Sequence, residues 1–170
     1  MERTLILLKP DSVARGVVGE ILTRFERAGL KIVGMKMINP DYEHYHEHYE
    51  GISGLKSRIG DEAFQATLDF MQEAPVIAAV LEGIEAISLV RKMVGSTEPK
   101  SAQPGTIRGD YAHVSFDHAN ARGVSIPNLI HASGNEKEAK AEIAHWFSES
   151  ELFDYTTVHE AYTLVKADKR

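Results

Sequence analysis

The segment 128–133 places His131 at the end of a short apolar run, with the hydroxyl group of Ser133 two residues later. Two basic residues, Lys9 near the N-terminus and Arg108 between glycines, are of a kind that contacts phosphate. A neutral imidazole is a good nucleophile toward phosphorus, and its ordinary pKa of about 6.5 keeps it available near neutral pH. These residue types together predict a histidine that carries a phosphoryl group.

Phosphoryl transfer requires in-line positioning of the reactants and positive charge around the moving oxygens. Lys9, Arg91 and Arg108 are the candidates for that charge, and Thr97 offers a hydroxyl group. The second nitrogen of the histidine needs a partner that fixes its tautomer, for which Glu142 is the candidate. The chain contains neither a GxxxxGK-S/T phosphate loop nor a GxGxxG fingerprint, which argues against the common nucleotide-binding folds.

The chain has 170 residues, 43% of them hydrophobic and 26% charged, which is the balance of an ordinary globular protein. The absence of cysteine excludes disulfides, thiolate zinc sites and a cysteine nucleophile. The formal net charge of -6 argues against a nucleic-acid partner, although a few converging arginines suffice to bind a small anion. No apolar run reaches membrane-spanning length, and the first residues lack the features of a signal peptide. We therefore expect no membrane association and a cytoplasmic location.

Hydrophobic periodicity predicts an alternation of strands and helices along the chain. Strands are predicted at residues 4–8, 30–38 and 75–81, with a final edge strand at 161–165. Helices are predicted at residues 17–25, 41–49, 61–71, 84–94 and 136–147. This order suits an α+β fold, namely a ferredoxin-like βαββαβ sandwich with an antiparallel four-stranded sheet and added helices.

Asp41 and Asp61 are the expected N-caps of two of these helices, because aspartate side chains accept hydrogen bonds from the free amides of a first turn. No repeat or linker divides the sequence, so residues 1–170 are expected to form one domain. Two segments rich in glycine or polar residues, 51–60 and 111–125, are interpreted as surface loops rather than as domain boundaries.

Several of these motifs, in this order, resemble the nucleoside diphosphate kinase family over almost the whole chain, from about residue 4 to residue 162. The matching segments are Lys9-Pro10-Asp11, Arg15-Gly16, Gly19-Glu20-Ile21, His48-Tyr49, Gly95-Ser96-Thr97 with Pro99, 104–110, 128–133 and Trp146-Phe147. The resemblance implies a ping-pong reaction, in which the γ-phosphate of a nucleoside triphosphate passes through a phosphohistidine to a nucleoside diphosphate.

The resemblance also implies roles for residues around the nucleophile. His131 matches the phosphorylated histidine, and Glu142 matches the carboxylate that orients it. Ser133 matches a hydroxyl group in the same hydrogen-bonded shell, and Tyr49 matches a tyrosine beside the histidine.

Five further residues match positions that contact the nucleotide in this family. Arg91, Thr97 and Arg108 match residues that bind its phosphates. Lys9 and Asn128 match the pair that contacts the sugar hydroxyl region, with Lys9 also close to the reacting phosphate.

The remaining implications concern the base, the metal and the assembly. Phe64 is the candidate aromatic platform for the base, although its helical spacing alone favours a core position. Mg²⁺ is implied as a cofactor that the nucleotide phosphates carry, so no metal ligands are assigned to the protein. The family resemblance further implies a homo-oligomer, either a hexamer or a tetramer built from dimers.

The chain departs from the usual family pattern at several positions. Ala132 and Gly134 stand where the family usually has glycine and aspartate, so the backbone and the start of the next helix are expected to differ. Ser12 replaces the usual glycine after Pro10-Asp11. The segments 51–60 and 111–126 are longer than usual, which loop entropy tolerates.

Two alternatives from other functional classes stay open at this point. A catalytically impaired family member could act as a nucleotide-binding or scaffolding module, as the departures suggest, but the nucleophile set is present. A phosphocarrier supplied by a protein donor would not need Lys9 and Asn128. The string His44, His46 and His48 also invites a metal interpretation, but on a helix only His44 and His48 would share a face.

Overall fold

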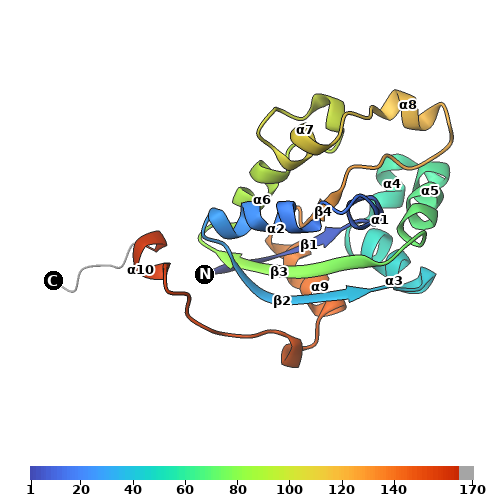
Figure 1. Ribbon diagram of the computed structural model, residues 1–170. Helices are drawn as coiled ribbons and strands as arrows, with labels where there is room; N and C mark the ends of the chain where they lie inside the picture. Colours follow the sequence, from blue (N-terminus) through green and yellow to red (C-terminus); the bar gives the residue numbers. More distant parts are fainter. Residues whose placement is uncertain (165–170) are drawn as a thin grey trace.

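The computed structural model describes residues 1–164, and its centre is a four-stranded antiparallel sheet in the order β2-β3-β1-β4 (Figure 1). The strands are β1 (Glu2–Leu8), β2 (Lys31–Ile38), β3 (Val76–Gly83) and β4 (Ile130–Ala132). Strand β1 pairs with both β3 and β4, and β2 pairs with β3. The expected α+β fold with an antiparallel four-stranded sheet is confirmed.

Helices cover both faces of this sheet. One face carries α3 (Tyr42–His46), α5 (Asp61–Met71) and α9 (Glu136–Trp146), and the other carries α2 (Val18–Arg27), α6 (Ala86–Val94) and α7 (Ile107–Tyr111). Successive side chains of a strand point to opposite faces. Leu5 and Leu7 of β1 accordingly pack with the first group, and Ile6 and Leu8 pack with the second. This two-sided burial explains why β1 reads as a continuous apolar run.

The predicted helices exist, with small changes at their ends. The side chain of Asp41 caps α3 by accepting a hydrogen bond from the amide of His44 at 2.9 Å, as expected. The prediction that Asp61 caps α5 is wrong, because Gly60 is the N-cap and Asp61 is the first helical residue. Helix α6 begins at Ala86 and ends before Gly95, whose φ of 86° lies in the region that favours glycine.

The predicted edge strand at residues 161–165 is wrong. Residues 160–163 form a short helix, α10 (Glu160–Thr163), and residue 165 lies outside the described part of the chain. The fourth strand is β4, which contains His131 and pairs with β1. At the opposite edge of the sheet, the amide of Phe153 donates to the carbonyl of Val33 at 2.7 Å. The segment around Phe153, here called the C-terminal segment, therefore lies along β2 without forming a strand.

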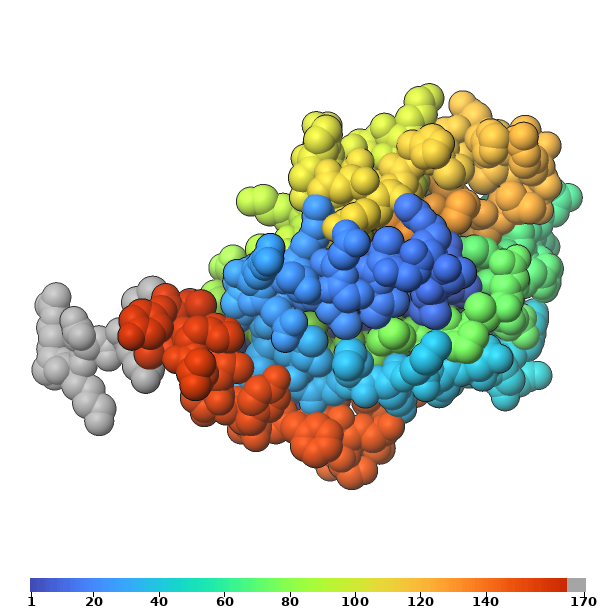
Figure 2. Space-filling view, viewed as in Figure 1, coloured from blue at the N-terminus to red at the C-terminus, as the bar shows by residue number. Residues whose placement is uncertain are grey.

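The two expected surface loops contain short helices. Between β2 and α5 lie the π-helix η1 (Glu47–Ile52) and α4 (Leu55–Ile59), and α8 (Phe116–Asn120) follows α7. The yellow and orange segment around α7 and α8 forms the upper part of the molecule (Figure 2). The other short elements are α1 (Pro10–Ala14), η2 (Pro99–Ser101) and η3 (Glu149–Glu151). Among the residues described, no helix has the length and apolar character needed to cross a membrane.

Candidate active site

His131 lies on β4 and faces the side of the sheet that α9 covers. Its neighbour Ile130 packs with the opposite helices, and His131 itself pairs with Leu7 of β1. Its side chain is 17% exposed, so one part of the ring is accessible while the rest is held by the protein. The short strand therefore presents a partly buried imidazole at the edge of the sheet.

A buried carboxylate orients this imidazole. Glu142 on α9 is fully buried, and its Oε1 lies 2.9 Å from Nε2 of His131. The hydroxyl of Ser133 donates to the other carboxylate oxygen at 2.5 Å and accepts from the amide of Leu5 at 3.1 Å. The Nε2–H of a neutral His131 thus points at Glu142, which leaves the lone pair on Nδ1. The structure brings together three of the four predicted catalytic residues in one hydrogen-bonded chain.

The start of α9 is well formed despite the departures from the family pattern. Neither Ala132 nor Gly134 has a positive φ, so the added methyl group is accommodated in extended backbone. Asn135 caps the helix by accepting from the amide of Glu138 at 3.0 Å, and Glu138 in turn accepts from the amide of Gly134. The cap that fixes α9 also fixes Glu142.

A second group of side chains lies beside the nucleophile. Nζ of Lys9 donates to Oδ1 of Asn128 at 2.7 Å, and Nδ2 of Asn128 donates to the carbonyl of Thr97 at 2.8 Å. Arg108 donates to the carbonyls of Gly95, Asn128 and Ile130, the last of these being the residue before His131. Asn128 therefore links Lys9, Thr97 and Arg108, which are far apart in the sequence.

Lys9 and Arg108 are both buried, and within residues 1–164 neither forms an ion pair with a carboxylate. Burial and the neighbouring Arg108 lower the pKa of Lys9 to about 8. Burial and the neighbouring Arg91 lower the pKa of Arg108 to about 10. Buried positive charges of this kind favour the arrival of an anion, because the anion restores the lost solvation.

Arg91 and Thr97 are the exposed members of the predicted phosphate-binding set. Arg91 lies on α6 close enough to Arg108 to affect its pKa. Thr97 lies in the segment that Asn128 anchors. We call Lys9, Arg91 and Arg108 the cationic cluster.

Tyr49 and His48 lie against the histidine from the η1 side. The ring of Tyr49 lies 6.2 Å from that of His131 at 84°, and burial raises the pKa of Tyr49 well above its ordinary range. Within residues 1–164 the Tyr49 hydroxyl is buried without a hydrogen-bond partner. His48 is fully buried, and its ring lies 4.7 Å from that of His131. No functional role is predicted for His48, which enters only through the histidine string and the matching segment His48-Tyr49.

His48, His131 and Glu142 place possible metal-ligand atoms within 4.8 Å of one another. However, Nε1 of Trp146 donates to Nδ1 of His48 at 3.1 Å. A neutral His48 then carries its proton on Nε2 and has no free lone pair for a metal. His44 is turned elsewhere and stacks on His145 at 3.9 Å. The histidine string is helical, as expected: His44 and His48 both pack edge-to-face against Trp146, whereas His46 contacts Phe64.

The assignment of Phe64 as a base platform needs correction. Phe64 is 3% exposed and packs in the core between α5 and the sheet, with the ring of His46 5.5 Å away in an edge-to-face arrangement. A base cannot stack on a ring whose faces are covered. The core position that its helical spacing favoured is the one observed.

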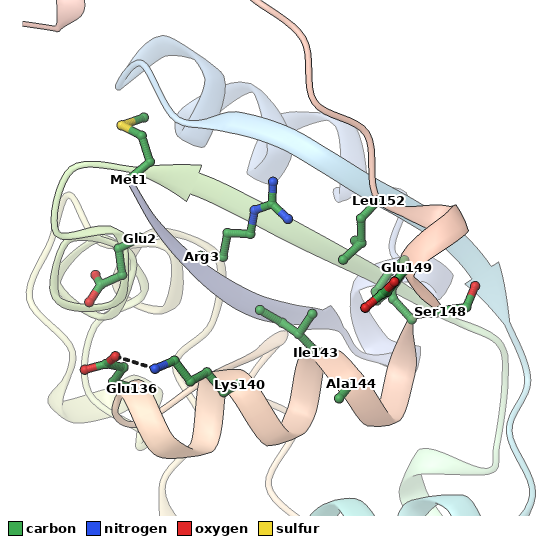
Figure 3. Close-up of a pocket in the computed structure, with 11 residues that line it drawn as sticks. Met1, Glu2, Arg3, Glu136, Lys140, Ile143, Ala144, Ser148, Glu149 and Leu152 are labelled. Atoms are coloured by element: carbon green, nitrogen blue, oxygen red, sulfur yellow. Dashed lines mark hydrogen bonds and ion pairs between the residues drawn. The ribbon is translucent and has the colours of Figure 1, made fainter.

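One hollow of the described structure is lined by none of the residues around His131. This hollow of about 790 Å³ opens between the start of β1, the length of α9 and the segment that follows it (Figure 3). Its lining residues are Met1, Glu2, Arg3, Glu136, Lys140, Ile143, Ala144, Phe147, Ser148, Glu149 and Leu152. None of the predicted site residues lines it.

The family model described as nucleoside diphosphate kinase matches residues 2–152 of this chain. A protein named nucleoside diphosphate kinase from Borreliella burgdorferi is 43% identical over 155 residues, which cover 91% of this chain and 92% of that protein. One of the same name from Pyrococcus furiosus is 47% identical over 155 residues, covering 91% and 88% of the two chains.

A solved structure gives the same result. The transition-state mimic of nucleoside-diphosphate kinase from Borrelia burgdorferi, with bound vanadate and ADP, superposes with a TM-score of 0.91. Its sequence identity is 42%, and the match covers 94% of this chain and 95% of that one.

Proposed function

The chain belongs to the nucleoside diphosphate kinase family, and on that premise we propose that His131 carries the phosphoryl group between nucleotides. The enzyme transfers the γ-phosphate of a nucleoside triphosphate to a nucleoside diphosphate. The observation that carries the assignment of His131 is its hydrogen bond to the fully buried Glu142. That bond selects the tautomer and leaves Nδ1 as the nucleophilic atom.

In the first half-reaction, the Nδ1 lone pair attacks the γ-phosphorus in line with the bond to the β-phosphate oxygen. The N–P bond forms as the P–O bond breaks, and the nucleoside diphosphate leaves with that oxygen. Positive charge develops on the imidazole, and Glu142 stabilises it while Ser133 holds the carboxylate in place. A second nucleoside diphosphate then reverses these steps.

The cationic cluster and its neighbours are proposed to bind the nucleotide. Arg91, Arg108 and Thr97 contact the phosphates, and Lys9 with Asn128 contacts the sugar hydroxyl region near the reacting phosphate. Support comes from the network that joins Lys9, Asn128 and Arg108 within hydrogen-bonding distance. Tyr49 is proposed to pack beside the imidazole and offer its free hydroxyl to the transferring group.

Mg²⁺ is proposed to accompany the nucleotide. When bound, it would neutralise negative charge on the nucleotide phosphates. The basic residues of the cationic cluster, which are proposed to contact the phosphates, would repel an unchelated dication. Both carboxylate oxygens of Glu142 already bind His131 and Ser133, and Asp11 accepts from the amide of Leu129 through Oδ2. The residues therefore fit a cation that the phosphates hold.

A homo-oligomer, a hexamer or a tetramer built from dimers, is part of the same proposal. The edge strand β2 exposes Met35 and Met37 by 54% and 60%, which offers apolar surface for such contacts. Sedimentation equilibrium gives the mass directly, and a monomer would contradict this part of the proposal. A cytoplasmic location stays a prediction from the sequence.

The phosphohistidine is tested by intact mass spectrometry after mixing the protein with ATP and Mg²⁺. We expect one acid-labile phosphoryl group on the wild type, its discharge by added nucleoside diphosphate, and its loss in His131→Ala. His113→Ala is the matched control, because His113 is an exposed histidine outside the site. A wild-type protein that binds nucleotide without gaining mass would favour a scaffolding role instead.

A further inference from the structure

Leu129 has an unusual backbone conformation two residues before the nucleophile. Its φ is +73°, in the left-handed region that side chains other than glycine rarely adopt. The amide of Ile130 donates to the carbonyl of Asn128 at 2.9 Å, which closes a γ-turn centred on Leu129. The turn is fully buried, so its conformation must be held by the surrounding protein.

The restraint comes from the other end of the sequence. Oδ2 of Asp11 accepts from the amide of Leu129 at 3.0 Å. The carbonyl of Leu129 accepts from the amide of Lys9 at 2.9 Å and from the hydroxyl of Ser12 at 2.6 Å. Ser12 is fully buried, which excludes water as a competitor for this bond. Both polar groups of the strained residue are thus satisfied by residues 9–12.

The turn connects the groups that must act together. On one side, the side chain of Asn128 binds Lys9 and its carbonyl binds Arg108. On the other side, Arg108 also binds the carbonyl of Ile130, which directly precedes His131. A change in the backbone at Leu129 would therefore move the cationic cluster relative to the imidazole.

We propose that Asp11 and Ser12 are positioning residues for phosphoryl transfer, because they hold the Leu129 turn that sets His131 relative to the cationic cluster. This rests on the proposed function of His131. Only Oδ2 of Asp11 is used in this restraint, because its Oδ1 is buried and, in the described part of the chain, lacks a hydrogen-bond partner. Its charge lies near Lys9 and Arg108 and partly balances them.

We call the hydrogen bonds from residues 9–12 to Leu129 the clamp, and the test compares three variants of it with a control. Ser12→Ala removes one bond to the Leu129 carbonyl, and Asp11→Ala removes the acceptor for its amide. Asp11→Asn keeps an oxygen at that place and serves as the conservative rescue. Thr23→Ala is the matched control, since Thr23 also donates its hydroxyl to a backbone carbonyl, at 2.7 Å, but on α2 and away from the turn.

The measurements are the single-turnover rate of His131 phosphorylation at saturating ATP and Mg²⁺, the nucleotide Kd, and the melting temperature. Misplacing reacting groups by about 1 Å costs up to roughly 100-fold in rate, so we expect Ser12→Ala and Asp11→Ala to slow phosphorylation by about 10- to 100-fold. We expect Kd to change much less, Asp11→Asn to recover most of the lost rate, and Thr23→Ala to match the wild type.

The outcomes separate the two proposals. A wild-type protein without phosphohistidine overturns the proposed function. If the wild type forms phosphohistidine but Ser12→Ala and Asp11→Ala are no slower than Thr23→Ala, the positioning role is overturned. A loss of phosphorylation rate that only tracks the fall in melting temperature also overturns it. Ser12→Ala and Asp11→Ala act on opposite ends of the same residue, so either folded variant decides the question.

Discussion

At the scale of single residues, Lys9 and Arg108 remain charged although both are buried. Burial lowers the pKa of Lys9 from 10.5 to about 8, so part of its charge is lost at mildly alkaline pH. The pKa of Arg108, at about 10, stays above that range. Lys9 is therefore the member of the cationic cluster whose charge responds to mild alkali.

We expect the wild-type rate of His131 phosphorylation to fall as the pH rises through about 8, where Lys9 loses its proton. Lys9→Arg should move this fall to higher pH, because a guanidinium stays protonated. Rapid-quench rates between pH 7 and 10 provide the measurement. A flat wild-type profile would show that the charge of Lys9 is not needed.

The same shift predicts an opposite trend in stability. The folded pKa of Lys9 is below its unfolded value, so the unfolded chain binds more protons between pH 8 and 10.5. The contribution of Lys9 to the free energy of unfolding therefore rises with pH across this window. Urea unfolding of wild type and Lys9→Met across these pH values isolates the contribution, and equal slopes would contradict it.

Glu142 and Ser133 are expected to act as one unit on His131. Glu142→Gln should slow phosphorylation by about 10- to 100-fold, as loss of a carboxylate that orients a histidine does elsewhere. Ser133→Ala should cost less, because Ser133 reaches the imidazole only through Glu142. In rapid-quench measurements the double variant should be no slower than Glu142→Gln, whereas multiplying effects would indicate independent roles.

At the scale of elements, α9 connects helix stability to the site. Asn135 caps its first turn, and Glu136 and Glu138 place negative charge at the positive end of the helix dipole. Glu142 lies further along the same helix and is fully buried. The Asn135 cap therefore stabilises the helix that carries the Glu142 carboxylate, and it does so without contacting His131.

Asn135→Ala should lower the free energy of unfolding by about 1 kcal/mol, because it removes the acceptor for the amide of Glu138. Asn135→Asp should retain most of that stability. Urea denaturation measures both, and phosphorylation should slow less than in Glu142→Gln. An unchanged unfolding free energy in Asn135→Ala would show that the cap contributes little.

At the scale of the whole molecule, the C-terminal segment is attached to β2 by contacts that do not include His131 or its partners. Lys31 binds Glu82 at 2.8 Å and the carbonyl of Tyr155 at 2.8 Å, and the hydroxyl of Tyr155 donates to the carbonyl of Ile32. Glu82 raises the pKa of Lys31, which keeps this anchor charged at neutral pH. None of these contacts involves the site residues.

Lys31→Met should loosen the C-terminal segment while leaving phosphorylation of His131 unchanged. We expect faster chymotryptic cleavage after Phe153 or Tyr155, because their attachment to β2 weakens. Lys56→Met is the control, since Lys56 pairs with Asp61 on an exposed surface. Cleavage at the wild-type rate would mean that Lys31 is dispensable for the attachment.

The sequence by itself determined the parts that depend on local pattern. Alternation and helical spacing predicted three strands and the main helices, since these patterns record which side chains face the core. The segments around His131, Lys9 and Arg108 indicated phosphoryl transfer because residue type and order carry the chemistry. The family resemblance added the expected roles of Ser133, Tyr49 and Asn128 to the candidates that residue type had already indicated.

Only the tertiary structure decided the rest, because it depends on pairing between distant segments. The three residues of β4 are too few to show a period, and they form a strand because the edge of β1 is available to them. Spacing favoured the core for Phe64 and the family resemblance favoured the base, and only the packing of α5 on the sheet decided between them. The clamp on Leu129 joins positions more than a hundred residues apart, and local spacing contains no record of such a contact.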